Sequence, residues 1–495
     1  MLRVVAVGVR LNPAPRPWAG YKSVMPDTPS TAPPDPQPNW LERYSAAIIL
    51  TVRLRIPDRP GSLARVLDAI ASARTPLGDI RIVGADSQCK TRDIGVFCVD
   101  RDHVAHTLDA IGSVDGVTIE RVIDEVMEIH RGGTIRTAST VALDSVMDLR
   151  MVYTPGVANV CEAIRDRPAE ARAFTAKGNK IAIVTNGTAV LGLGDIGALA
   201  GLPVMEGKAA ILAHYVGVSA EPILIDTKDT AHLIGVVESI ASAYGAIQLE
   251  DIAAPACFEI ETTLNGRLDV PVFHDDQHGT ATVCIAGLIN ALRQTGRQPG
   301  DIDALVLGAG AAGLAIARFL IDFGVRDVII CDSRGALTPD RTEGMNPWKI
   351  DVARLTNHGR VSGPLEVAVR GRNLLVGVSR PNTVTQDMVR SMAPNPIVFA
   401  LANPVSEISA DDAREAGAAI AIDGRGMNNA LAYPGLFRGT LDAEATDITH
   451  EMKLAAAHAL ADAAGSEALL PQMTDREVHR RVTEAVALAW RSRSS

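Results

Sequence analysis

The sequence predicts a multidomain α/β protein, in which a small ferredoxin-like module precedes two larger α/β domains. Three observations predict this class: a βαββαβ succession of patterns between residues 48 and 122, a series of short apolar runs separated by helical stretches after residue 281, and a glycine-rich turn at residues 308–313. A chain of 495 residues is too long for one compact core, which agrees with several domains.

Composition narrows the class of protein further. The chain is 47% hydrophobic and has no run of eighteen apolar residues, so we expect a folded protein without a membrane span. Its net charge of −10 argues against a nucleic-acid partner. The six cysteines show no CxxC spacing, which favours free thiols in a reducing compartment, the cytoplasm.

Residues 1–43 are predicted to be a disordered, proline-rich tail. Nine of the 28 prolines fall in residues 12–38, where they alternate with serine, threonine and aspartate. Such a segment buries little apolar surface and has few backbone donors.

Residues 44–127 are predicted to form the ferredoxin-like module. Its strands are expected at 48–56, 79–85, 94–99 and 117–122, and its helices at 62–70 and 102–112. This order, together with the turn Asp58-Arg59-Pro60-Gly61 before the first helix, resembles an ACT domain. The resemblance implies that Asp58, Pro60 and Gly61 contact a small effector such as an amino acid. The alternative is a dimerisation module without a ligand.

Two α/β domains follow, at 128–280 and 281–495. The second has four short apolar runs, 304–307, 328–331, 374–378 and 397–401, which are typical of parallel strands covered on both faces. Two helices, near 447–464 and 476–490, are expected to close the chain.

A dinucleotide-binding turn is predicted between the first two of these strands. A strand precedes the turn, a helix follows it, and its residues are Gly308, Gly310, Ala311, Ala312 and Gly313. This is the layout in which backbone amides at a helix N-terminus bind a pyrophosphate. Asp332 ends the next strand and favours NAD, because a carboxylate repels a 2′-phosphate. Arg334, two residues later, leaves NADP open.

Pairs of carboxylates follow two other apolar runs. Glu250 and Asp251 come after one, and Asp275 and Asp276 come after the next. Oxygen ligands from two strand ends suit a hard divalent cation, Mg²⁺ or Mn²⁺. Solvated loop residues are the alternative.

Two further residues are candidates for acid–base catalysis. Lys208 opens an apolar stretch, where burial would lower the pKa of its amine and let it act as a base. Tyr153 precedes a Pro-Gly turn and could donate a proton at a cleft. The alternative for Lys208 is an amine that extends to solvent, and the alternative for Tyr153 is a packing role.

Taken together, the motifs of residues 150–440 resemble the bacterial-type malic enzymes. The matching stretches, in the order of the family, are VYTPGVA, TNGTAVLGLGDIG, PVMEGKA, LIDTKD, LEDI, VFHDDQHGTA, GAGAAG, LANP and MNNALAYPGLFRG. The resemblance implies a malic-enzyme N-terminal α/β domain followed by a Rossmann-type, doubly wound NAD-binding domain. It also implies oxidative decarboxylation of (S)-malate to pyruvate and CO₂ with NAD or NADP.

The resemblance implies specific roles for the candidate residues. Lys208 would be the base, oriented by Asp275, and Tyr153 the acid that protonates the enolate carbon. Ligands of Mg²⁺ or Mn²⁺ would be Glu250, Asp251 and Asp276. Asparagines would contact the substrate and the cofactor: Asn403 and Asn429 the malate carboxylates, and Asn403 and Asn428 the NAD. A homodimer or a larger homo-oligomer is expected.

The sequence departs from the family pattern in one loop that bears on the cofactor. Residues 377–385 carry Arg380 and Asn382 where smaller residues are usual, so cofactor fit there stays open. Two other functions also stay open at this stage. One is an amino-acid dehydrogenase, which needs no metal, and the other is a non-catalytic sensor linked to the ACT-like module.

Overall fold

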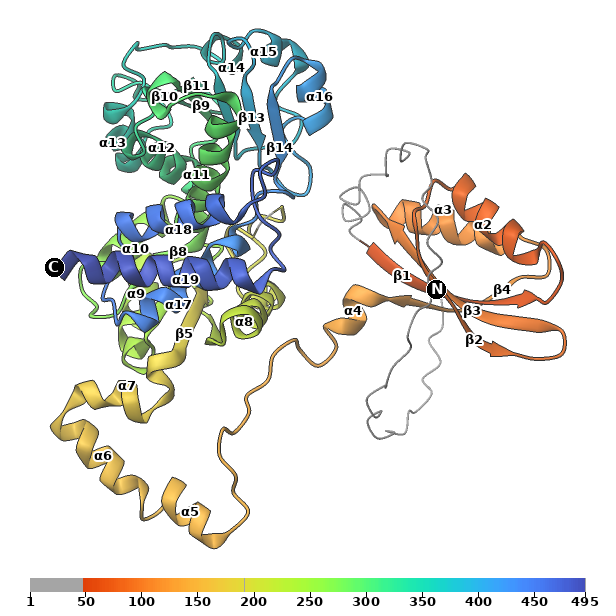
Figure 1. Ribbon diagram of the computed structural model, residues 1–495, viewed down its shortest axis with the longest axis horizontal. Helices are drawn as coiled ribbons and strands as arrows, with labels where there is room; N and C mark the ends of the chain where they lie inside the picture. Colours follow the sequence, from red (N-terminus) through yellow and green to blue (C-terminus); the bar gives the residue numbers. More distant parts are fainter. Residues whose placement is uncertain (1–47, 191, 495) are drawn as a thin grey trace. The chain divides into compact units, whose positions relative to one another are not determined.

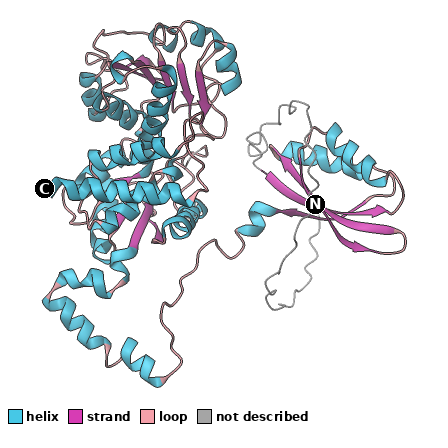
Figure 2. Ribbon diagram, viewed as in Figure 1, coloured by secondary structure: helices cyan, strands magenta, loops and turns pink. Residues whose placement is uncertain are grey.

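The computed structural model describes residues 48–190 and 192–494 (Figures 1 and 2). The predicted tail, residues 1–43, lies outside this part of the chain. In the part that is described, no helix combines the length and the apolar character that crossing a membrane requires.

Residues 48–124 form one antiparallel sheet with two helices, in the predicted βαββαβ order. The elements are β1 (Ile48–Pro57), α2 (Ser62–Ser72), β2 (Leu77–Ala85), β3 (Cys89–Cys98), α3 (Arg101–Gly112) and β4 (Thr118–Asp124). The strand order is β2-β3-β1-β4. Alternate residues of β1, including Val52 and Leu54, pack against Val66 and Ile70 of α2. Gly61 caps α2 with a φ of 83°, so the predicted turn is present.

A largely exposed segment follows this module. It contains α4 (Glu125–Ile129), α5 (Val146–Val152), α6 (Val157–Asp166), η1 (Pro168–Glu170), α7 (Ala171–Phe174) and η2 (Ala176–Asn179). Apolar side chains of α5 are exposed to solvent, among them Val146, Met147 and Met151.

The next part is built on a parallel four-stranded sheet of order β6-β5-β7-β8. Its elements are β5 (Lys180–Thr185), η3 (Leu199–Gly201), α8 (Leu202–Val216), β6 (Ser219–Leu224), α9 (Thr230–Ile240), η4 (Ala241–Ala243), β7 (Ala246–Leu249), α10 (Ala256–Asn265), β8 (Val272–His274) and α11 (Asp275–Thr295). The predicted boundary between residues 280 and 281 falls inside α11. Most of that helix is buried, so it belongs to the cores of both neighbouring domains.

The dinucleotide-binding part has a six-stranded sheet of order β11-β10-β9-β12-β13-β14. Its elements are η5 (Pro299–Asp301), β9 (Asp303–Leu307), α12 (Ala311–Asp322), β10 (Asp327–Asp332), β11 (Gly335–Ala336), α13 (Pro347–Leu355), α14 (Leu365–Ala368), β12 (Leu374–Gly377), α15 (Gln386–Arg390), β13 (Ile397–Ala400), α16 (Ala410–Glu415) and β14 (Ile420–Asp423). All four predicted strands are confirmed, and they pair in parallel.

Both faces of this sheet are covered, as the continuous apolar runs predict. Val306 and Val376 face a core that includes α12 and α13, whereas Leu305 and Leu375 face a core that includes α14, α15 and α16 (Figure 1). From β9 the strand order runs outward to β10 and β11, and the chain then returns to place β12 on the other side of β9. The switch point of the sheet therefore lies between β9 and β12. Ligands of open α/β sheets bind at the carboxyl ends of the strands at this switch point.

Three α-helices and two short 3-10 turns at the end of the chain complete the structure. They are η6 (Asn429–Leu431), α17 (Tyr433–Asp442), α18 (His450–Ala463), α19 (Arg476–Arg491) and η7 (Ser492–Ser494). Buried residues of α17, α18 and α19 join the same core as α11. The C-terminal helices therefore pack on the domain that carries Lys208 rather than on the far face of the dinucleotide sheet.

Candidate active site

A buried lysine of α8 lies between two carboxylates, one directly after β7 and the other at the start of α11. Lys208 belongs to α8. Pro203 lies at the start of this helix, and Gly217 ends it in a left-handed conformation. The Nζ of Lys208 lies 2.6 Å from Oδ2 of Asp275 and 3.0 Å from Oε1 of Glu250. The lysine side chain is 11% exposed, and the two carboxylates are almost fully buried.

The electrostatics of this cluster differ from the prediction for Lys208. Burial alone would lower the pKa of the Lys208 amine, but the negative charges of Asp275 and Glu250 outweigh burial and raise it. Burial also raises the pKa of both carboxyl groups, against the opposing effect of the Lys208 charge. The expectation of a lowered lysine pKa was therefore wrong for this isolated chain, because sequence spacing did not show that two acids face the amine.

Three carboxylates next to this lysine converge as a possible metal site. Glu250 and Asp251 directly follow β7, and Asp276 lies in the first turn of α11, where the helix dipole favours an anion. One oxygen from each of the three lies within 4.8 Å of the others. Asp251 has a φ of 53°, a left-handed conformation that is uncommon for residues other than glycine. The oxygen donors and their spacing fit a hard divalent cation.

The glycine-rich turn after β9 has the shape that a pyrophosphate requires. A Cβ on Gly308 would lie 2.5 Å from the Val378 carbonyl oxygen, and one on Gly313 would lie 1.9 Å from the Gly308 oxygen. By contrast, no atom lies within 4 Å of the Cβ position of Gly310. Two of the glycines thus allow close backbone packing, and the third leaves open the space that a ligand would fill.

One cavity of about 510 Å3 joins this turn to the carboxylate cluster. Its lining includes most of the residues predicted to bind cofactor or substrate: Gly310, Ala311, Ala312, Asn403, Asn428 and Asn429. Asp276 and Arg380 line the same cavity. Side chains that are far apart in the sequence therefore meet beside one dinucleotide-binding turn.

Asp332 is held by two cations at the end of β10. Arg341 and Lys349 both contact its Oδ2, the lysine at 2.8 Å, and the backbone amide of Arg334 donates to its Oδ1. Burial would raise the pKa of Asp332, but these hydrogen bonds outweigh burial and lower it to about 2. The predicted acid is in place, and its charge is largely neutralised by its neighbours.

Tyr153 is the one predicted catalytic residue outside the cluster. It follows α5, and its side chain is 71% exposed. Within the described residues, the structure does not bring it into the buried group around Lys208.

Two buried polar residues beside the site were not predicted. The ring of Tyr433 lies below Lys208, with Nζ 4.6 Å from its centroid, and its buried hydroxyl has no hydrogen-bond partner among the described residues. Glu407 is fully buried and accepts hydrogen bonds from the amides of Ser379 and Ala402, which line the cofactor cavity. Glu407 stands between Ser406 and Ile408 in a largely polar stretch, so no signal in the sequence pointed to it. For Tyr433, the signal was the motif that also contains Asn428 and Asn429.

A doubly wound sheet with a dinucleotide-binding turn, next to a lysine and a carboxylate triad, defines a nucleotide-dependent oxidoreductase. Comparison with known families agrees with this class. Residues 133–234 match the malic enzyme N-terminal domain, and residues 277–490 match the malic enzyme NAD binding domain. The chain belongs to the malic enzyme family.

Individual relatives support the same assignment. The chain is 42% identical to the NAD-dependent malic enzyme of Geobacillus stearothermophilus, over 90% of this chain and 95% of that one. It is 39% identical to the NADP-dependent malic enzyme of Haemophilus influenzae, over 72% of this chain and 50% of that one. Among solved structures, the NAD-dependent malic enzyme of Thermotoga maritima superposes with a TM-score of 0.71 at 40% identity, covering 74% of this chain and 99% of that one.

Proposed function

We propose that this chain catalyses the oxidative decarboxylation of (S)-malate to pyruvate and CO₂, with NAD as the hydride acceptor and a divalent cation, Mg²⁺ or Mn²⁺. The observation that carries the proposal is the contact of Lys208 with Asp275 and Glu250, next to a cavity that the dinucleotide turn also lines. Family membership supports malate rather than an amino acid as the substrate. The presence of Lys208 together with the carboxylates of Glu250, Asp251, Asp275 and Asp276 favours an enzyme over a non-catalytic sensor.

In this proposal Lys208 accepts the proton of the malate 2-hydroxyl. Asp275 holds the amine by a 2.6 Å contact and so fixes its direction. Asn403 and Asn429, in the wall of the cavity, would donate amide hydrogen bonds to the substrate carboxylates.

Glu250, Asp251 and Asp276 would hold the divalent cation, which when bound would polarise the C2 oxygen of malate and stabilise the enolate charge left by CO₂ loss. Bound NAD would accept the hydride from C2. Because the three carboxylates would share their charge with a cation, they would no longer favour the protonated form of Lys208 as strongly. The lysine would then be able to act as a base at neutral pH.

Tyr153 is proposed as the acid that protonates C3 of the enolate. In the single chain its side chain is exposed, and the neighbouring apolar residues of α5 are exposed as well. Exposed apolar side chains on a short helix support the proposal that the protein is a homodimer or a larger homo-oligomer in which this segment is covered.

NAD is proposed as the cofactor because Asp332 ends the strand that follows the dinucleotide turn. NADP is the second candidate, because Arg341 and Lys349 surround Asp332 and would attract a 2′-phosphate. Comparing kcat/KM for malate oxidation with each cofactor decides between them.

The N-terminal module is proposed to be an ACT domain that binds a small effector such as an amino acid. Its βαββαβ order and the left-handed Gly61 support this proposal, as does Asp58, whose carboxylate lies at the same turn and pairs with Lys90 at 2.8 Å. Titrating the full chain with amino acids while following NADH formation tests it. A response that is lost in Gly61→Val would support the turn as the site.

We further propose a cytoplasmic location, since every cysteine in the described residues is a free thiol. The proposed activity is tested by steady-state assays with malate, comparing NAD⁺ with NADP⁺ and Mn²⁺ with a chelator. Turnover of an amino acid, or turnover that survives chelation, would contradict the proposal.

A further inference from the structure

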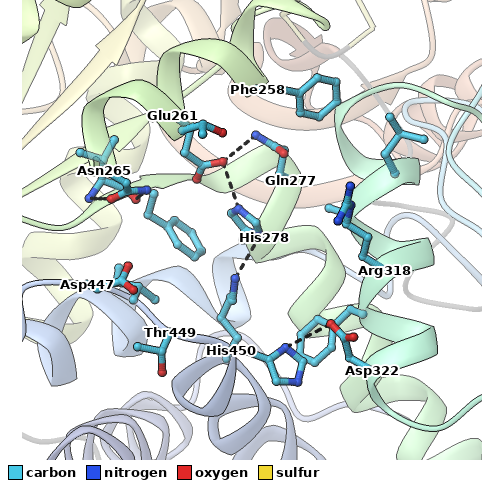
Figure 3. A pocket seen from close by; sticks show the side chains of 18 of the residues that line it. Phe258, Glu261, Asn265, Gln277, His278, Arg318, Asp322, Asp447, Thr449 and His450 are labelled. Atoms are coloured by element: carbon cyan, nitrogen blue, oxygen red, sulfur yellow. Dashed lines mark hydrogen bonds and ion pairs between the residues drawn. The ribbon is translucent and has the colours of Figure 1, made fainter. Parts of the chain in front are cut away.

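A glutamate of the neighbouring helix binds the first turn of α11. Glu261 lies in α10 and is 8% exposed. Its Oε1 accepts a hydrogen bond from the backbone amide of His274 at 2.7 Å. Its Oε2 accepts one from the side-chain amide of Gln277 at 2.9 Å and lies 3.1 Å from Nε2 of His278 (Figure 3). Three residues at the start of α11 are therefore bound to a single carboxylate.

The contact between His278 and Glu261 has a defined direction. Nζ of Lys453 lies 3.4 Å from the other ring nitrogen of His278, Nδ1. An ammonium can only donate, so Nδ1 is the acceptor, and Nε2 carries the hydrogen that is donated to Glu261. Burial lowers the pKa of His278, which favours this neutral form of the ring. All three contacts of Glu261 are thus hydrogen bonds that its carboxylate accepts.

These hydrogen bonds flank two carboxylates of the proposed active site. Asp275 and Asp276 lie directly between His274 and Gln277 in the sequence, and they begin α11. Successive residues of a helix are turned by about 100°, so the two sides of one turn can face different neighbours. Glu261 therefore holds this turn from the side opposite to the site.

The positions of the two carboxylates depend on the backbone of this turn. A Cβ on Gly279 would lie 1.9 Å from Oδ1 of Asp275, so this carboxylate lies directly against the helix. Its other oxygen contacts Lys208 at 2.6 Å. Asp276 accepts the backbone amide of Asp251 through Oδ2, at 2.9 Å. With contacts this short, a rotation of the turn would move both carboxylates away from their partners.

The side of the turn that faces Glu261 borders a cavity of about 700 Å3. Glu261, Gln277 and His278 all line this cavity (Figure 3). Side chains that border open space have neighbours to pack against on one side only. Their hydrogen bonds to Glu261 therefore decide where they lie.

We propose that Glu261 is a positioning residue for the proposed metal site. It fixes the first turn of α11, and so places Asp276 for the cation and Asp275 for Lys208. This inference rests on the proposed function, in which the cation and the base are defined. Groups that orient metal ligands without touching the metal change metal affinity by about 10–100-fold when they are replaced.

The test uses the full chain and measures the dissociation constant for Mn²⁺ by electron paramagnetic resonance of the free ion, which needs no turnover. The thermal unfolding midpoint, the kcat for malate oxidation and the KM for NAD are measured on the same proteins. Glu261→Gln removes the charge, whereas Glu261→Asp keeps the charge on a shorter side chain. Gln277→Met removes one of the three donors. Glu259→Gln is the matched control, since Glu259 is an exposed residue of the same helix.

We expect Glu261→Gln and Glu261→Asp each to raise the dissociation constant for Mn²⁺ about tenfold, because neither side chain can accept all three hydrogen bonds. Gln277→Met should raise it about threefold, since one hydrogen bond is lost. In the two Glu261 variants kcat should fall about tenfold, while the KM for NAD stays within about twofold of the wild type, because the dinucleotide turn is unchanged. Glu259→Gln should match the wild type in every measurement.

Three results would overturn the proposal. The first is an unchanged Mn²⁺ affinity in Glu261 variants whose unfolding midpoint falls, which would show a role in stability alone. The second is a loss of affinity in Glu261→Gln but not in Glu261→Asp, which would show that only the charge acts. The third is a wild-type chain without a saturable Mn²⁺ site, which would also overturn the proposed metal.

Two further outcomes separate this inference from the proposed activity and from misfolding. If Mn²⁺ binding responds as expected in a chain that does not oxidise malate, the proposed activity fails and the role of Glu261 stands. If neither Glu261 variant folds, Gln277→Met decides, because it keeps Glu261 and removes a single hydrogen bond. A Gln277→Met protein with the Mn²⁺ affinity of the wild type would then count against the proposal.

Discussion

The ammonium of Lys208 lies 2.6 Å from a carboxylate oxygen of Asp275, and both groups are buried. Each residue comes from a different helix, α8 and α11, so the contact depends on the packing of the fold rather than on local sequence. The attraction raises the pKa of the lysine and fixes the direction of its amine.

Asp275→Asn should reduce kcat by about 100-fold or more, because a positioned acid–base pair loses its orientation. Since the charge of Asp275 raises the pKa of Lys208, its removal lowers that pKa. If activity requires the neutral amine, the rising limb of the kcat–pH profile should move to lower pH. A profile that falls in amplitude without any shift would contradict the role of this charge.

Asp251→Asn should weaken Mn²⁺ binding by about tenfold or more, because one of three converging oxygen ligands becomes a neutral amide. Electron paramagnetic resonance of free Mn²⁺, titrated with protein, measures binding without any assay of activity. Asp387→Asn is the matched control, since Asp387 is an exposed carboxylate that pairs with Arg390. Equal Mn²⁺ affinity in both variants would exclude the triad as the metal site.

Two glycines of the dinucleotide turn should respond differently to alanine. Gly313→Ala places a Cβ 1.9 Å from a backbone oxygen, which should destabilise the protein by about 1–3 kcal/mol. Gly310→Ala meets no atom within 4 Å, so the unfolding midpoint should stay unchanged while the KM for NAD rises. Thermal unfolding and cofactor kinetics of both variants check this contrast. A Gly310→Ala protein with wild-type cofactor affinity would show that the pyrophosphate binds elsewhere.

Tyr433→Phe should keep near-normal activity, because the ring under Lys208 stays and only an unpartnered buried hydroxyl is lost. Tyr433→Leu removes the ring and with it a cation–π attraction of about 0.5–2 kcal/mol that favours the charged amine. The pKa of Lys208 should therefore fall, and the rising limb of the kcat–pH profile should move to lower pH. Identical pH profiles for the two variants would remove Tyr433 from the electrostatics of the site.

Much of the fold could be predicted from local pattern. Strands covered on both faces are uniformly apolar, so the runs at 304–307 and 397–401 identified β9 and β13. The glycine spacing predicted the turn at Gly308, because close backbone packing allows no side chain there. The domain boundary was harder to place, since α11 is one continuous buried helix whose apolar pattern gives no sign of a break.

Most residues of the site could be predicted from the sequence, but the direction of the Lys208 pKa shift could not. Glu250, Asp251 and Asp276 do converge, as expected for carboxylates at the ends of parallel strands. The direction of the Lys208 pKa was wrong, because it depends on which charges the fold places around the amine. Tyr433 and Glu407 were missed for a related reason. Their roles come from burial against other elements, which sequence spacing does not reveal.

The most direct test of the proposed chemistry is the turnover of malate by Lys208→Ala, measured together with the dissociation constant for NAD. The account predicts a kcat lowered by about 100-fold or more, because the base is removed, with NAD affinity close to that of the wild type. A variant that still converts malate at nearly the wild-type rate would contradict it.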